Sequence, residues 1–221
     1  LRKTKSNYKF IFRSKNQLNI LSIKSIKLNL DKIKPDYVLH LAGLSRPMKI
    51  HEKNILKSIN LNIIGTGNIV NECFKKKIKL IYISTNYLYP GIKGNYKETN
   101  ALLPWNNYGW SKLGGESAVQ MYKNSLIIRA CMTEYPFVHK YAFSNMFTNF
   151  IYHKDFIKIM EKILNQKGIL NIGGKGKTVY EFAKKYNFSV IRKKMKKNNT
   201  DNLPLNTLMN LNKLNKILKK K

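Results

Sequence analysis

Acidic residues are scarce in this sequence. Its 221 residues include 11 Asp and Glu against 42 Lys and Arg, which gives a formal net charge of +31 at pH 7. Such a charge attracts polyanions, namely nucleic acids, anionic lipids or phosphorylated substrates. The basic residues are spread along the whole chain, however, and no zinc finger, RNA-binding sheet motif or basic zipper stands out. We therefore expect no dedicated nucleic-acid binding.

Cysteine and long apolar runs are also rare. The 2 cysteines, Cys73 and Cys131, have no metal-ligand spacing around them and predict reduced core thiols. The 4 histidines are scattered, so we expect no metal site. No apolar run approaches the ~18 residues that a membrane span requires, and we expect a cytoplasmic protein. A hydrophobic content of 43% is enough for the core of one domain with a small lobe.

Short apolar runs and helical periodicities alternate along the first part of the chain. They predict strands at 8–13, 36–42, 78–84 and 125–130, and helices at 25–33, 55–76 and 106–123. This order is typical of an α/β fold, a Rossmann-like doubly wound parallel sheet with helices on both faces. We assign residues 1–129 to this domain.

After Arg129 the pattern loosens, and we assign residues 130–221 to a small C-terminal lobe. Two helices, a strand, a solvated Lys/Asn-rich loop, and a final loop with a short helix are predicted there. The helices are predicted at 155–165 and 178–186, and the strand at 188–192. The solvated loop covers 193–202, and the final loop with its short helix runs from 202 onward.

The segment Y-G-W-S-K at 108–112 places a tyrosine four residues before a lysine inside a helical pattern. One helical turn puts Tyr108 and Lys112 on the same face. A free phenol has a pKa near 10, and a neighbouring ammonium lowers that pKa toward the working range. The pair therefore suits proton transfer to or from a carbonyl or alcohol oxygen. The spacing is common by chance in a chain with 13 Tyr, so the flanking sequence decides its meaning.

A predicted strand precedes this helix and ends in two hydroxyl residues, Ser84 and Thr85. Ligands of open α/β sheets bind beyond the carboxyl ends of the strands, where a hydroxyl can bond a substrate oxygen. A loop of about twenty residues follows, and loops of that length are more often functional than idle. Asn106 or Asn107 would cap the next helix.

Further segments accompany the tyrosine and lysine. They read P-D-Y-V-L-H-L-A-G at 35–43, N-I-I-G-T at 62–66, S-T-N-Y-L-Y-P-G at 84–91, L-P-W-N-N-Y-G-W-S-K-L-G-G-E at 103–116, L-I-I-R at 126–129 and G-I-L-N-I-G-G at 168–174. Together they resemble the extended short-chain dehydrogenase/reductase superfamily, and within it the dTDP-4-dehydrorhamnose reductase-like sugar-nucleotide enzymes. The likeness runs from about residue 8 to residue 218.

The resemblance implies a catalytic triad of Thr85, Tyr108 and Lys112. Tyr108 would be the general acid in carbonyl reduction. Lys112 would hold the nicotinamide ribose and lower the pKa of Tyr108. Thr85 would bond the substrate oxygen, with Ser84 as its substitute in substrate binding.

The resemblance also implies a dinucleotide site. Arg13 lies at the end of the predicted strand 8–13, where an arginine accommodates the 2′-phosphate of NADP, so NADP is favoured and NAD stays possible. Asn19 stands where the family usually carries an aspartate near the adenine. Leu41, Ala42 and Gly43 are expected to contact the cofactor together with Tyr108 and Lys112.

A glycine-rich turn between a strand and a helix, which would hold the pyrophosphate, is absent from the sequence. The glycines at 65–67 lie inside a helical pattern, and residues 171–178 lack the first glycine of a phosphate-binding loop. We expect neither to bind phosphate. Since the sequence begins at Leu1, we interpret it as lacking roughly 30 N-terminal residues, the size of a strand–turn–helix unit. This chain by itself could then be inactive.

Departures from the family pattern limit the choice of sugar. Asn86, an expected substrate contact, replaces an acid, and no tryptophan follows Arg129. Arg46, a second expected substrate contact, either meets a substrate phosphate or faces water. The aromatic residues of 131–153 form either the core of the lobe or a wall against the nucleotide sugar: Tyr135, Phe137, Tyr141, Phe143, Phe147 and Phe150.

Four functions compete at this point. The first is NADP-dependent reduction of a 4-keto-6-deoxy sugar nucleotide, with a homodimer possible. The second is an epimerase or dehydratase with the same site, although dehydratases usually place an acid after the threonine, where this chain has Asn86. The third is a non-enzymatic regulatory subunit on the same fold, which has no need of both Tyr108 and Lys112. The fourth, a polyanion-binding protein, depends on charge alone.

Overall fold

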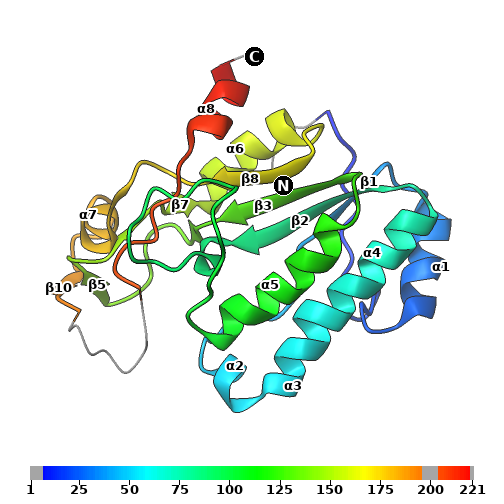
Figure 1. Ribbon diagram of the computed structural model, residues 1–221, viewed down its shortest axis with the longest axis horizontal. Coiled ribbons are helices and arrows are strands. Elements are labelled where there is room, and N and C mark those ends of the chain that lie inside the picture. The colour runs from blue at the N-terminus through cyan, green and yellow to red at the C-terminus, as the bar shows by residue number, and fades with distance from the viewer. Residues whose placement is uncertain (1–6, 196–203, 220–221) are drawn as a thin grey trace.

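The computed structural model describes residues 7–195 and 204–219 (Figure 1). Its centre is a parallel sheet of four strands in the order β1-β2-β3-β8. The strands are β1 (Tyr37–His40), β2 (Lys79–Thr85), β3 (Ser125–Ala130) and β8 (Gly168–Ile172). Three of them match predicted strands within a few residues. The α/β class with a parallel sheet is therefore confirmed.

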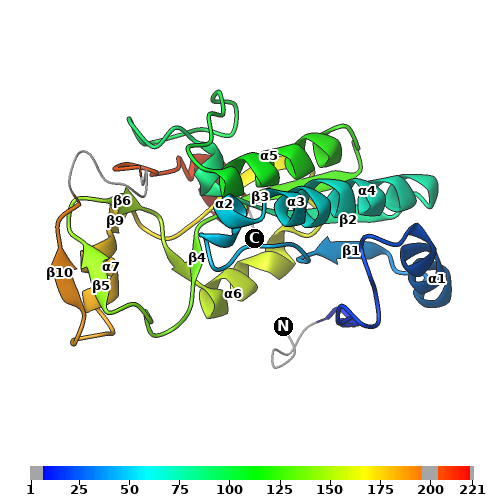
Figure 2. The ribbon, with the colours of Figure 1, turned by 90° about the horizontal axis from the view of Figure 1, so that it is seen from below.

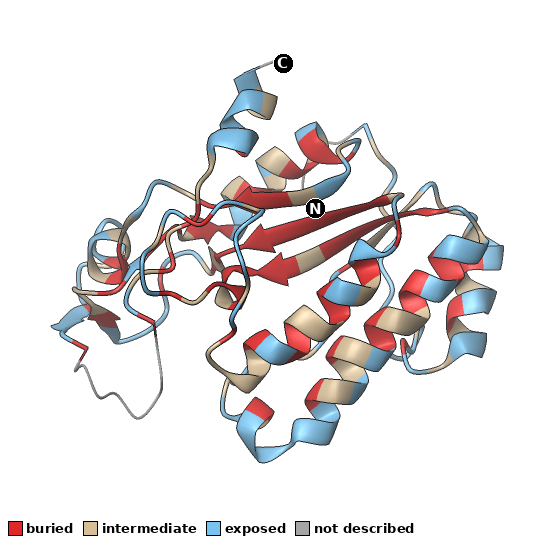
Figure 3. Cartoon of the chain, in the orientation of Figure 1, coloured by how far each residue is buried: buried red, intermediate tan, exposed pale blue. Residues whose placement is uncertain are grey.

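Side chains of alternate strand residues enter two separate cores. Leu80, Tyr82 and Ile127 pack with the helices α1 (Ile23–Ile33) and α4 (Gly65–Lys75), while Ile81 and Ile128 pack with α6 (His153–Ile163) on the opposite face. Both faces are covered, which is why these strands read as continuous apolar runs. Figure 3 shows the central strands as the most buried part of the chain. Within the described ranges, no helix is both long and apolar enough to cross a membrane.

Helices form a layer on each side of the sheet (Figure 2). One layer contains α1 (Ile23–Ile33), α2 (Ile50–Lys53), α3 (Ile55–Ser58), η1 (Ile59–Ile64), α4 (Gly65–Lys75) and α5 (Asn107–Gln120); the other contains α6 (His153–Ile163). The predicted helix 55–76 is present as the consecutive segments α3, η1 and α4, of which η1 is π-helical. As predicted, the glycines at 65–67 lie inside a helix rather than after a strand.

The C-terminal residues build a lobe of short elements beside the carboxyl ends of the strands (Figure 1). They are β4 (Met132–Thr133), β5 (Tyr141–Phe143), β6 (Phe147–Thr148), β7 (Ile151–Tyr152), β9 (Lys177–Thr178), α7 (Val179–Lys184) and β10 (Ile191–Lys193). The final helix, α8 (Asn212–Lys219), packs instead against β8, in the same core as α6. The strands pair as β4 with β7, β5 with β10 and β6 with β9. Most of the predicted loop 193–202, and the start of the tail predicted from 202, lie outside the described residues.

The aromatic residues of the lobe divide between its interior and its surface. Phe137 is 3% exposed, and Phe143 and Phe150 pack against the same cluster, which also contains Ala142 and Val179. These three residues are core. Three others are 41–51% exposed, namely Tyr135, Tyr141 and Phe147.

The predicted strand 8–13 is wrong. Residues 9–13 have no strand pairing, and Ile11 and Phe12 are 48% and 36% exposed. Tyr8 packs its ring edge-on against Tyr37, at a centroid distance of 6.2 Å. An apolar run becomes a strand only where a neighbour satisfies its backbone groups, and no strand precedes β1 within the described range. β1 is therefore an edge of the sheet.

Candidate functional site

Thr85 and Tyr108 meet at the carboxyl end of β2. Thr85 is the last residue of that strand and is 5% exposed. Its hydroxyl caps the short 3₁₀ turn η2 (Asn86–Leu88) by accepting from the Tyr87 amide at 3.3 Å. A hydrogen bond between the Thr85 side chain and the Tyr108 phenol acts to lower the pKa of that phenol. The strand thus delivers a hydroxyl directly to the tyrosine.

The start of α5 sets the position of Tyr108. The Asn106 side chain caps the helix by accepting from the Gly109 amide at 2.8 Å, as the sequence predicted for this position. A Cβ at Gly109 would lie 2.8 Å from the Tyr87 carbonyl oxygen, so only glycine permits this close approach. The helix therefore begins directly against the turn that follows Thr85.

Aromatic rings surround the Tyr108 phenol. The Tyr87 ring lies edge-on at 5.6 Å and the His51 ring at 5.0 Å, both measured between centroids. Burial raises the pKa of Tyr108, while the Thr85 hydrogen bond and the Arg46 charge act in the opposite direction. Tyr108 is consequently a protonated phenol at neutral pH.

Lys112 points beneath the tyrosine into the protein. It is 8% exposed, its Nζ donates to the Ile83 carbonyl oxygen at 2.8 Å, and it lies 4.1 Å from the Tyr82 ring centroid. Burial lowers the pKa of Lys112 to about 7, and the Glu116 charge opposes this shift. The expected lowering of the Tyr108 pKa is not found, because burial dominates at both groups and Lys112 is only partly charged near neutral pH.

A buried ion pair lies one helical turn beyond Lys112. Glu116 accepts from Arg129 at 2.6 Å, with side chains 1% and 2% exposed, and from the Ser84 hydroxyl at 2.5 Å. Arg129 also donates to the Tyr89 hydroxyl at 2.9 Å. This network fixes β2, β3 and α5 relative to one another under the site. Glu116 lies one helical turn after Lys112, as Lys112 does after Tyr108, so the four-residue spacing could have identified this carboxylate from the sequence. No spacing in the sequence links it to its partner Arg129.

Three predicted substrate contacts have other partners in this structure. Ser84 donates to Glu116 and is 4% exposed. Asn86 is 1% exposed and donates to the Thr207 hydroxyl at 3.1 Å, which ties the turn η2 to the C-terminal segment. Arg46 remains half exposed and forms an ion pair with Glu134 of the lobe. Of the three, only Arg46 lies at the surface beside Tyr108.

The predicted cofactor residues divide into two groups. Leu41, Ala42 and Gly43 form an exposed loop at the carboxyl end of β1, where Asn62 anchors the backbone by bonding both polar groups of Leu44. A Cβ at Gly43, whose φ is +155°, would lie 2.8 Å from the Asn62 Oδ1 atom.

The second group lies away from Tyr108. Arg13 is exposed and outside the sheet. Asn19 precedes α1, where its side chain accepts from the Leu21 amide at 3.0 Å. No described contact joins either residue to the catalytic candidates.

The donor groups at the carboxyl ends of β1 and β2 fit one end of a dinucleotide. Lys112 uses one of its three ammonium donors on Ile83, and the Tyr108 phenol is half-buried. Together with the exposed loop after β1 they suit a nicotinamide ribose. The described residues contain no glycine-rich strand-to-helix turn for the pyrophosphate. The residues present therefore fit the nicotinamide end of the cofactor.

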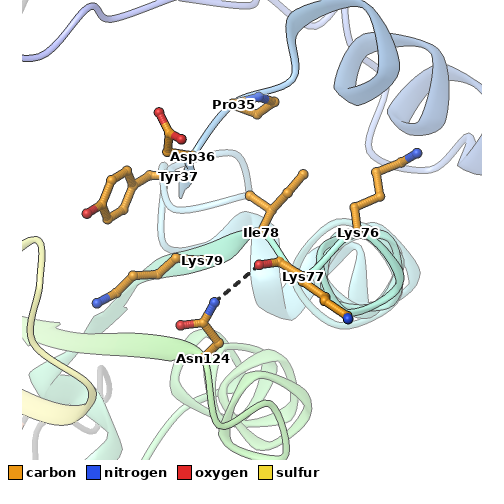
Figure 4. Close-up of a pocket in the computed structure, with 8 residues that line it drawn as sticks. All are labelled: Pro35, Asp36, Tyr37, Lys76, Lys77, Ile78, Lys79 and Asn124. Atoms are coloured by element: carbon orange, nitrogen blue, oxygen red, sulfur yellow. Dashed lines mark hydrogen bonds between the residues drawn. The ribbon is translucent and has the colours of Figure 1, made fainter.

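A hollow of about 350 Å³ lies at the opposite, amino end of β1 and β2 (Figure 4). Lys76, Lys77 and Lys79 line it, together with Asp36 and Asn124. The carboxyl ends of α1 and α4 face this edge, and lysines there complement the negative ends of the helix dipoles. Since ligands of parallel sheets bind at the other end, we do not assign the reaction to this hollow.

The chain belongs to the RmlD substrate-binding domain family, whose family model matches residues 2–172. The resemblance to dTDP-4-dehydrorhamnose reductases within the extended short-chain dehydrogenase/reductase superfamily is thereby confirmed.

Curated relatives fall into two kinds. The beta subunit of methionine adenosyltransferase 2 from Xenopus tropicalis is 32% identical over 102 residues, which cover 46% of this chain and 30% of that protein. A dTDP-4-dehydrorhamnose reductase from Aggregatibacter actinomycetemcomitans is 23% identical over 159 residues, 71% of this chain and 49% of that enzyme. The chain thus spans half or less of the length of these relatives.

Solved structures share the fold. The dTDP-4-dehydrorhamnose reductase of Bacillus anthracis, solved in complex with NADP, superimposes with a TM-score of 0.81 at 21% identity and covers 94% of this chain and 82% of that one. A Bordetella bronchiseptica enzyme solved with NAD superimposes with a TM-score of 0.74 at 17% identity, covering 90% of this chain and 71% of that one. At these identities the comparison shows the fold.

Proposed function

We propose that this chain carries the catalytic residues of an NADP-dependent reductase of a 4-keto-6-deoxy sugar nucleotide. The observation that carries the proposal is the contact of Thr85 with Tyr108 at the carboxyl end of β2, with Lys112 one helical turn away. Membership of the family and the likeness to dTDP-4-dehydrorhamnose reductases support the substrate class.

The raised pKa of Tyr108 suits the direction of reduction. A phenol that stays protonated at neutral pH is a proton donor, and an alkoxide that develops on the substrate carbonyl is a stronger base than a phenolate. Tyr108 therefore gives its proton downhill as negative charge grows on the ketone oxygen. The Thr85 hydroxyl donates to the same oxygen, or to the phenolate that remains.

Lys112 stabilises the phenolate after proton transfer to the extent that it is itself protonated, and its free donors suit the ribose hydroxyls. The nicotinamide would supply the hydride. NADP is the favoured cofactor because the reductase from Bacillus anthracis was solved with NADP. NAD is the alternative, and a relative of the same fold was solved with NAD.

The test follows NADPH absorbance with the full-length protein and 4-keto-6-deoxy sugar nucleotides. We expect oxidation by the wild type and a ~10²–10⁴-fold lower rate for Tyr108→Phe, the range that general acid catalysis supplies. Lys79→Met, at the far end of β2, is the control and retains the wild-type rate. Equal rates for wild type and Tyr108→Phe remove the tyrosine from the mechanism.

A non-catalytic subunit is the second candidate. Its support is the group of curated relatives named as beta subunits of methionine adenosyltransferase 2. The one from Xenopus tropicalis has a higher sequence identity to this chain, 32%, than the curated reductase, 23%. Tight NADPH binding without turnover of any sugar nucleotide would favour this function. Turnover that depends on Tyr108 would exclude it.

A further inference from the structure

Three tyrosine rings from separate segments of the lobe meet beside the start of α6. Tyr135 follows β4, Tyr152 ends β7, and Tyr186 follows α7. Their centroids lie 5.0 Å, 5.3 Å and 5.8 Å apart, with interplanar angles of 88°, 64° and 63°, which are edge-on arrangements. We call these residues the tyrosine triad. Two of the rings remain open to a ligand, since Tyr135 and Tyr186 are 49% and 43% exposed.

Two lysines stand over the triad. The Lys154 Nζ atom lies 3.5 Å from the Tyr135 centroid, and the Lys185 Nζ atom lies 4.9 Å from the Tyr186 centroid. In the part of the chain that the structure describes, neither forms an ion pair with a carboxylate.

The acidic neighbours of the triad are already occupied. Asp155 pairs with Lys158 at 3.1 Å, and Glu134 pairs with Arg46. The Asp155 charge also acts on Lys185 and Tyr152, but Lys154, Lys158, Lys185 and Arg46 outnumber the two carboxylates. The triad therefore presents net positive charge next to exposed aromatic rings, which is an environment for an aromatic anion.

The hydroxyl of Tyr152 points to a ligand independently. Tyr152 is 4% exposed, and its hydroxyl has no hydrogen-bond partner among the described residues. A buried hydroxyl without a partner costs free energy and is rare in native proteins. A polar ligand atom between the rings would satisfy it.

Arg46 connects the triad to the candidate catalytic residues. Its charge acts on the Tyr108 phenol, and its guanidinium bonds Glu134, the residue before Tyr135. A ligand that reaches from Tyr108 past Arg46 therefore arrives at the triad.

We propose that the tyrosine triad, with Lys154 and Lys185, binds the nucleoside diphosphate part of the sugar-nucleotide substrate. The base stacks on the exposed rings of Tyr135 and Tyr186, and the ammonium groups bind the diphosphate. Because the Tyr135 ring already holds the Lys154 ammonium in place, less side-chain entropy is lost when the phosphate binds. This inference depends on the proposed function for its substrate class.

Isothermal titration calorimetry of the full-length protein tests the site with three probes: thymidine diphosphate, uridine diphosphate and inorganic pyrophosphate. Tyr135→Leu and Lys154→Met are each expected to lower the affinity about tenfold for whichever of the two nucleotides the wild type binds more tightly. Tyr141→Leu and Lys140→Met are the matched controls. Tyr141 is 51% exposed, with the Lys140 Nζ atom 5.6 Å from its ring centroid, and both control variants are expected to bind as the wild type does.

Tyr152→Phe separates binding from folding because it removes only the hydroxyl. We expect weaker nucleotide binding with a melting temperature equal to or above that of the wild type, since the unpaired group is gone. A lowered melting temperature with unchanged binding would assign the hydroxyl a structural role and overturn the inference. Equal affinity for pyrophosphate and both nucleotides, or equal losses in the control variants, would overturn it as well.

Tyr108→Phe distinguishes this inference from the proposed reaction, because it should retain nucleotide binding. If the triad variants weaken nucleotide binding but the wild type does not reduce the ketone, the proposed reaction is wrong and the nucleotide subsite stands. If the wild type reduces the ketone but the triad variants bind nucleotide as tightly as the wild type does, the proposed nucleotide subsite is wrong and the proposed reaction stands.

Discussion

The two ends of the parallel sheet present opposite kinds of surface. At the amino end a hollow of about 350 Å³ is lined by lysines and open to solvent (Figure 4). At the carboxyl end Thr85, Lys112 and Arg129 are 2–8% exposed, and each has a defined hydrogen-bond partner. The hollow thus lies at the end of the sheet to which we assign no reaction. Convergence of buried polar groups is therefore the better guide to a site in this molecule.

The largest effect on stability is expected from breaking the ion pair beneath the site. Glu116→Leu leaves the Arg129 guanidinium buried without its carboxylate and should lower the free energy of unfolding by about 3–5 kcal/mol. Urea denaturation measures the change. Asp155→Ala removes the carboxylate of a solvent-exposed pair and should cost below about 1 kcal/mol. Similar costs at the two positions would mean that the carboxyl end is no more rigidly held than the surface.

Gly115→Ala should have the next largest effect. A Cβ there would lie 2.3 Å from the Asn62 carbonyl oxygen, so α5 would have to move away from η1. We expect a loss of about 1–3 kcal/mol, measured by thermal unfolding. Gly67→Ala is the matched control, since a Cβ there meets nothing within 4 Å. Helix propensity should make that variant more stable by up to about 1 kcal/mol, and equal responses would refute the close approach.

The pH dependence of stability isolates Lys112. Burial lowers its pKa from 10.5 to about 7, so between these values the unfolded chain binds a proton that the folded chain does not. Its contribution to stability should therefore rise with pH across this window by up to about 1.4 kcal/mol per unit. Lys112→Met should lose this rise relative to wild type. Parallel curves for the two proteins would show that the lysine titrates normally.

The smallest effect is expected at the amino end of the sheet. Lys77 follows Lys76, the C-cap of α4, and has a φ of +57°, a left-handed conformation that favours glycine. Lys77→Gly should raise the free energy of unfolding by about 0.5–1 kcal/mol. A loss of stability would show that the contacts of the Lys77 side chain stabilise the fold by more than its left-handed backbone conformation costs.

Much of the sheet could be predicted from the sequence because its strands are short β-rich apolar runs bounded by turn residues. β2 and β3 are of this kind. The run at 8–13 has the same composition but no strand to pair with, and composition contains no information about neighbours. The π-helical turns of η1 were not predictable either, because their period differs little from that of an α-helix over six residues.

The site was predictable where it follows local spacing. Tyr108, Lys112 and the cap at Asn106 are a few residues apart, and the strand before them ends at Thr85. The partners of these groups were not predictable, since Lys112 bonds a carbonyl of β2 and Glu116 bonds Arg129 from β3. The direction of the Tyr108 pKa depends on burial, which spacing alone does not reveal.

The central claim is that Thr85 and Tyr108 act together on one substrate oxygen. Rates of NADPH oxidation with a 4-keto-6-deoxy sugar nucleotide, compared among wild type, Thr85→Val, Tyr108→Phe and the double variant, test it most directly. Residues that act as a unit give non-additive losses, so the double variant should be about as slow as Tyr108→Phe alone. Losses that multiply, or a Tyr108→Phe variant as fast as wild type, would contradict the account.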